Sequence, residues 1–104
     1  MTDYSNMSDF EINAAVATVK FGNWESNADI YPLITSKRID YCNNPADAWP
    51  IIIENKISII SMYSGGDSWQ VDAGEDEEFV LHQQSNPLRA AMIVFLMMKD
   101  AEKC

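Results

Sequence analysis

Histidine, the residue type that most often transfers protons in catalysis, occurs once in this chain of 104 residues, as His82. A Ser-His-Asp or Cys-His catalytic arrangement would therefore have to use it. Its neighbours Leu81 and Gln83 place it at the end of a predicted strand, and a surface histidine without a catalytic role is the favoured interpretation. We therefore predict that the protein is not an enzyme.

Carboxylates form the densest group of potential metal ligands. Six of them, with no basic residue among them, lie between Asp67 and Glu78. They lack the D-x-D-x-D-G-x5-E spacing of a calcium loop, so a solvated loop or hairpin with weak ion binding at most is expected. The six are Asp67, Asp72, Glu75, Asp76, Glu77 and Glu78.

Cysteines and glycines also show no pattern of a ligand site. Cys42 and Cys104 have neither the number nor the spacing of a zinc site or a disulfide framework. The pair Gly65-Gly66 lacks the lysine of a phosphate-binding loop and is expected to form a hairpin turn. We therefore expect no metal and no cofactor.

The charge and hydropathy of the whole chain limit its partners. A formal charge of -9 repels nucleic-acid backbones and anionic lipids. The N-terminus lacks the features of a secretory signal, and the apolar run 90–98 is too short to cross a bilayer. No direct nucleic-acid or membrane partner is expected, and a reducing cytoplasm suits the two cysteines.

Three helices with capped starts are predicted. Ser8 and Glu11 form a capping box before a helix over Asp9–Lys20. Asn-Pro pairs begin the other two, which span Pro45–Glu54 and Leu88–Lys99. Pro50 should kink the second helix or divide it. The third is apolar around most of its circumference and is expected to be covered by the rest of the chain.

Alternating apolar residues predict three strands, over Lys56–Met62, Trp69–Asp72 and Phe79–His82. A short edge strand interrupted by proline is also possible within Asp29–Thr35. The fold class is therefore α+β: a small antiparallel sheet of about three strands packed with two to three helices, an α/β sandwich. Residues 1–7 should be a mobile segment and residues 8–104 a single domain.

Three tryptophans raise the question of which rings are buried. Trp49 has helical spacing with Ile53 and is expected in the core. Trp24 lies in an irregular segment with Tyr31 and is the better candidate for exposure at an interface.

Three sequence blocks resemble a known family. They are S-D-F-E-I-N at 8–13, Y-C-N-N-P-A-D-A-W-P-I-I-I at 41–53 and N-P-L-R-A-A-M-I-V-F-L-M-M at 86–98. They are similar to the NinX-like proteins of lambdoid phages and prophages, and their order resembles the phage α/β sandwich domain. The resemblance implies a phage or prophage protein that acts in the cytoplasm of the bacterial host, with no catalytic residues to transfer.

The leading hypothesis is a noncatalytic accessory protein that binds a host or phage protein, as a monomer rather than a homodimer. An acidic mimic of nucleic acid, which would inhibit a DNA-binding protein, is the alternative. An enzyme with an unrecognised site is third. The candidate interface residues are Trp24, Tyr31, Asp72, Glu75, Asp76, Glu77 and Glu78.

Overall fold

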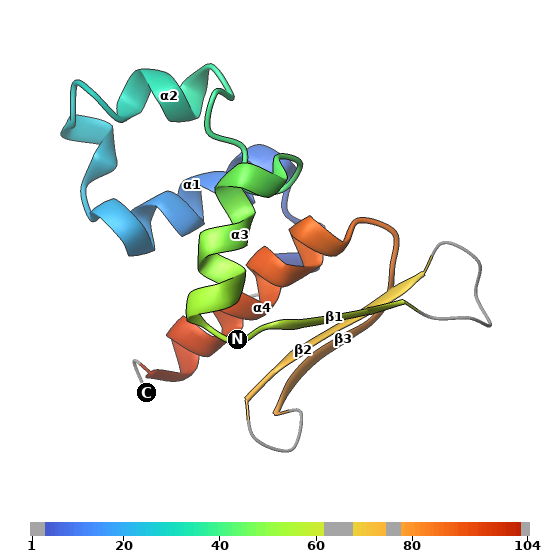
Figure 1. The fold of residues 1–104 in the computed structure, drawn as a ribbon. Coiled ribbons are helices and arrows are strands. Elements are labelled where there is room, and N and C mark those ends of the chain that lie inside the picture. The colour runs from blue at the N-terminus through green and yellow to red at the C-terminus, as the bar shows by residue number, and fades with distance from the viewer. Residues whose placement is uncertain (1–3, 62–67, 75–77, 103–104) are drawn as a thin grey trace.

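A computed structural model describes residues 4–61, 68–74 and 78–102, although not the side chains of residues 83 and 84. Within these residues, helices pack against one face of an antiparallel sheet (Figure 1). The α+β class predicted from the sequence is confirmed. In chain order the elements are η1 (Tyr4–Asn6), α1 (Asp9–Phe21), η2 (Trp24–Ser26), α2 (Tyr31–Thr35), α3 (Pro45–Glu54), β1 (Ser58–Ser61), β2 (Trp69–Ala73), β3 (Phe79–Gln84) and α4 (Pro87–Glu102).

The described strands form a sheet in the order β1-β2-β3, with both pairs antiparallel. Ile59 pairs with Val71, and Val71 pairs with Leu81, so these three side chains share one face. Val71 is fully buried, whereas Ile60 on the opposite face is 43% exposed. The first face is therefore the one that the helices cover.

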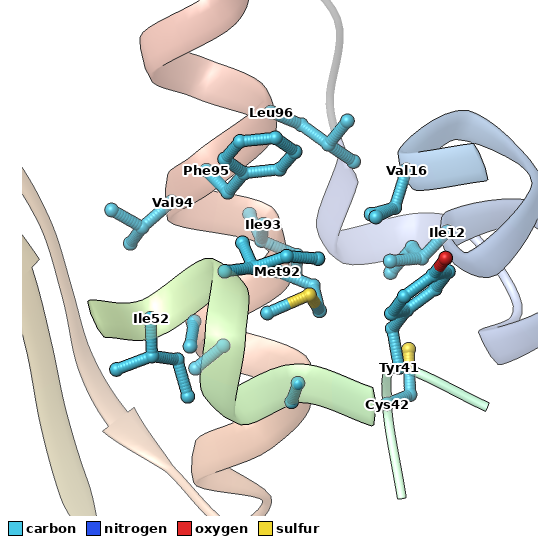
Figure 2. Close-up of a cluster of buried hydrophobic side chains, with 14 of the residues drawn as sticks. Ile12, Val16, Tyr41, Cys42, Ile52, Met92, Ile93, Val94, Phe95 and Leu96 are labelled. Atoms are coloured by element: carbon cyan, nitrogen blue, oxygen red, sulfur yellow. The ribbon is translucent and has the colours of Figure 1, made fainter. Parts of the chain in front are cut away.

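Helix α4 lies at the centre of the molecule because nearly its whole circumference is apolar. Its residues 90–96 are all buried, and it contacts α1, α3, β2 and β3. Figure 2 shows Met92 of α4 lying between the side chains of α1 and those of α3. The rest of the chain therefore covers α4, as predicted: α1, α3 and the sheet pack around it.

Side-chain caps begin the long helices where the sequence predicts them. Ser8 Oγ accepts the Glu11 amide at 3.1 Å, and the Glu11 carboxylate accepts the Ser8 amide at 3.1 Å. Asn44 Oδ1 accepts the Ala46 amide at 3.0 Å. Asn86 Oδ1 accepts the amides of Leu88 at 3.0 Å and Arg89 at 3.2 Å. Polar caps therefore fix the starts of α1, α3 and α4.

The prediction of an edge strand at Pro32 is wrong, and of the two outcomes predicted for Pro50, the division of the helix does not occur. Pro32 does not interrupt an edge strand, because Tyr31–Thr35 is a short helix and proline is compatible with a first helical turn. Pro50 does not divide α3, which continues from Pro45 to Glu54. Pro50 is exposed, so the backbone hydrogen bond that it cannot make is lost on the outer side of the helix, where water is available.

Residues 4–7 pack against α4, which their polar composition did not predict. The Tyr4 ring is 8% exposed, and its hydroxyl donates to the Asp100 carboxylate. The Arg89 guanidinium donates to the backbone carbonyls of Met7 at 2.5 Å and Ser5 at 3.3 Å. Residues 4–7 thus make defined contacts with the domain, while residues 1–3 lie outside the described part.

Candidate interaction surface

Four apolar residues form an exposed stripe along α3. Ala46, Trp49, Pro50 and Ile53 occupy positions i, i+3, i+4 and i+7, which share one side of a helix. Trp49 and Ile53 are each 56% exposed, the largest values among the exposed large hydrophobic residues of the described chain. We call these four residues the α3 face.

A second apolar stripe explains why the α3 face points outward. Ala48, Ile51 and Ile52 are buried, and this side of α3 packs against α4. A helix can place only one side on its neighbour. The α3 face therefore lies on the side that remains uncovered.

Charged side chains border the α3 face at both ends. Near its start the Asp47 carboxylate accepts the Asp40 amide at 2.8 Å and is half-buried. At its end Glu54 and Lys56 are exposed, and neither forms an ion pair with another described residue. Glu54 is in the last turn, where the negative end of the helix dipole disfavours a carboxylate.

A polar cluster holds the start of α3 against α1 and α4. The buried Asn13 side chain donates to Asp40 at 2.9 Å and accepts the Cys42 amide at 3.2 Å. Asn86 Nδ2 donates to the Cys42 carbonyl at 2.9 Å. Arg89 forms an ion pair with Asp9 at 2.7 Å. These bonds fix the orientation of the turn that precedes α3, and therefore of the α3 face.

Burial makes the two residues next to this cluster poor acids. Burial, with a smaller effect of the Asp47 charge, raises the pKa of Tyr41 to about 12. Burial also raises the pKa of Cys42 to about 12, and the Asp9 charge adds to the rise, whereas Arg89 acts in the opposite direction. The Cys42 thiol therefore stays protonated at neutral pH and is a poor nucleophile.

Within residues 4–61, 68–74 and 78–102, no three His, Cys, Asp or Glu side chains are grouped to hold a metal ion. None of the helices in these ranges is long and apolar enough to cross a membrane. A shallow depression beside α2 is lined by Pro32, Leu33, Ser36 and Arg38.

The candidate interface residues that the structure describes differ in their exposure. Trp24 is 5% exposed and stacks on Tyr31, with ring centroids 6.0 Å apart, while its indole donates to Thr18 at 3.1 Å. The expectation that Trp24 is exposed is therefore wrong, and Tyr31 alone of this pair presents a large exposed surface, at 47%. The hydroxyl of Thr18 explains the difference, because it gives the buried indole a hydrogen-bond partner.

The structure describes two of the acidic candidates, Asp72 and Glu78. Asp72 is 8% exposed and accepts a hydrogen bond from Gln70 at 3.1 Å, so it presents little charge at the surface. Glu78 is exposed at the start of β3. Glu75, Asp76 and Glu77 lie outside the described residues.

Sequence reasoning missed the α3 face because it placed Trp49 and Ile53 in the core. Their helical spacing is compatible with either side of the helix. The missed signal is the second apolar stripe. Ala48, Ile51 and Ile52 form another apolar side of the same helix, and this side is the one that is buried. A short helix with two apolar sides on a small domain leaves one of them exposed.

The fold and this surface define a small two-layer α+β protein that presents an apolar helix face. The family model described as bacteriophage P22, NinX matches residues 3–99, and the chain belongs to this family. The resemblance predicted from the sequence blocks is confirmed. Neither the curated proteins nor the solved structures contain a significant match to the chain.

Proposed function

We propose that this phage protein is a noncatalytic accessory module that binds a host or phage protein in the cytoplasm of the infected bacterium. The contact is made by the α3 face. The observation that carries this proposal is the exposure of Trp49 and Ile53, at 56% each, on one side of a well-anchored helix. Tryptophan is enriched among the residues that dominate protein interfaces, and contiguous exposed apolar patches mark interaction sites.

The alternative, an acidic mimic of nucleic acid, has weaker support. Mimicry requires carboxylates fixed at the surface in a phosphate-like array. Asp72, the central member of the acidic segment, is buried and bonded to Gln70. The net charge of -9 is compatible with both functions, but it disfavours direct contact with nucleic acid.

Affinity capture from infected cells tests the proposal. The native chain is compared with Trp49→Gln and Ile53→Gln, and Phe10→Gln serves as the matched control because Phe10 is 40% exposed on a different helix. A specific protein should be captured by the native chain and by the control but lost with the two α3 variants. Equal capture by all four proteins would reject the α3 face as the binding site. Circular dichroism confirms that each variant is folded.

A further inference from the structure

The α3 face has the spacing of one half of a contact between two helices. Its four apolar residues repeat at i, i+3, i+4 and i+7, the positions by which an amphipathic helix contacts an apolar partner. The stripe extends over about two turns, or about 10 Å along the helix axis. The side chains of such a helix form ridges that pack into the grooves of another helix. The geometry therefore favours a helix as the occupant.

Carboxylates form one border of the α3 face. Asp47 and Glu54 are seven residues apart, so about two turns of helix place them on the same side of α3. Each directly follows a member of the α3 face, Ala46 or Ile53. Asp47 is half-buried, Glu54 is exposed, and α3 itself contains no basic residue. A partner that covers the α3 face therefore meets negative charge along this border.

The position of Glu54 favours a cation from outside the chain. In the last turn of α3 the negative end of the helix dipole disfavours this carboxylate. Lys56 follows the helix, but it forms no ion pair with Glu54 in the part of the chain that the structure describes. A positive group supplied by a partner would interact favourably with both the carboxylate and the end of the helix.

The same charges disfavour a second copy of the chain as the occupant. An antiparallel pair of α3 helices would place Glu54 of one copy beside Asp47 of the other, and a parallel pair would place each carboxylate beside its own equivalent. Like charges across an interface are unfavourable. The net charge of -9 disfavours anionic lipids and nucleic acids for the same reason.

We propose that the occupant of the α3 face is a basic amphipathic helix of another protein. Its apolar side packs on Trp49, Pro50 and Ile53, and its lysine or arginine side chains lie beside Asp47 and Glu54. The proposal rests on the proposed function, since it names the class of partner that binds the same surface. The chain itself acts as a monomer in this interaction.

Two synthetic helical peptides test the class of partner. Both carry leucine at positions i, i+3, i+4 and i+7, and the remaining positions are mainly lysine in one peptide and mainly glutamate in the other. The lysine peptide should bind the native chain and shift the NMR amide signals of α3, whereas the glutamate peptide should not bind. Equal binding of both peptides, or no binding of the lysine peptide, would overturn the proposal.

Variants of the apolar residues separate a specific contact from general attraction between opposite charges. Trp49→Gln should weaken binding of the lysine peptide by about tenfold or more, because a central tryptophan dominates a small interface. Phe10→Gln, which changes an exposed aromatic residue of α1, should leave the affinity unchanged. Equal affinities for the native chain and Trp49→Gln would show that charge alone attracts the peptide and would overturn the proposal.

Variants of the carboxylates test the charged border. Glu54→Gln should weaken binding of the lysine peptide by about twofold to fivefold, the range expected for one exposed ion pair. Glu25→Gln is the matched control, because it removes the same charge from an exposed position on η2, which contacts α1 and α2. Equal losses of affinity for the two variants would reject the role of the border.

The two proposals fail in different ways. In capture from infected cells, Glu54→Lys should lose the bound protein, and the control Glu25→Lys should retain it. A captured protein that depends on Trp49 but is held equally by both lysine variants would reject the basic helix and retain the protein-binding function. A lysine peptide that binds as predicted, with no captured protein that depends on Trp49, would reject the proposed function and retain the preference of the α3 face for a basic helix.

Discussion

One buried amide, Asn13, joins segments that are distant in the sequence. It is 2% exposed, donates to Asp40 at 2.9 Å and accepts the Cys42 amide at 3.2 Å. A buried polar group is costly unless each of its donors and acceptors has a partner. Asn13 meets this condition and at the same time fixes the turn that leads into α3.

Asn13→Ala should therefore lower the free energy of unfolding by about 1 to 3 kcal/mol, because the Cys42 amide and the Asp40 carboxylate both lose a partner. Urea denaturation measures the loss. Asn43→Ala is the control: it removes hydrogen bonds in the same turn, but Asn43 is exposed and water can replace them. An equal loss for both variants would show that burial of Asn13 is not the cause.

The raised pKa values of Tyr41 and Cys42 predict that the protein loses stability in alkaline solution. Their pKa values of about 12 in the native state lie above the ordinary values of 10.0 and 9.0. Well below pH 9 both groups are protonated in the folded and the unfolded state, so their contribution to the free energy of unfolding is fully present. At higher pH the unfolded chain releases protons that the native state retains, and stability falls as pH rises toward about 12.

Urea denaturation at pH values from about 8 to about 11 checks this slope. The double variant Tyr41→Phe/Cys42→Ala should show a smaller decrease across the same interval than the native chain. An identical slope would assign the alkaline destabilisation to other groups, such as the lysines.

At the scale of the elements, local signals in the sequence predicted most of the fold. Capping residues and apolar periodicity placed α1, α3 and α4, and alternation placed the three strands. The helices between Trp24 and Thr35 were not predicted, because they are one or two turns long and depend on contacts with α1. The exposed side of α3 was missed for a related reason: tertiary packing against α4, rather than local pattern, decides which of two apolar stripes is buried.

A pair of substitutions tests this division between buried and exposed aromatics. Phe95 of α4 is 4% exposed, and Phe95→Ala should cost about 3 to 5 kcal/mol of unfolding free energy because it empties a packed core site. Trp49→Ala on the α3 face should cost less than about 1 kcal/mol in the monomer. Chemical denaturation at low protein concentration measures both. A larger cost for Trp49 than for Phe95 would contradict the packing described for the two helices.

At the scale of the whole molecule, the two ends of the described chain meet. Tyr4 donates to Asp100, and Arg89 near the start of α4 holds the carbonyls of Ser5 and Met7. Residues 4–7 thus contact α4 instead of leading away from the domain.

Removal of residues 1–7 should consequently destabilise the protein by about 2 to 4 kcal/mol, the order expected for losing a buried aromatic side chain and its hydrogen bond. Tyr4 supplies the ring, and Arg89 would lose two carbonyl acceptors while keeping its ion pair with Asp9. Urea denaturation compares this truncation with removal of residues 1–3 alone, which leaves Tyr4 in place and should have a much smaller effect. Unchanged stability after loss of all seven residues would support the sequence-based prediction that residues 1–7 are a mobile segment outside the domain. A loss confined to the longer truncation would instead show that residues 4–7 belong to the domain, because Tyr4 is buried and bonded to Asp100 of α4.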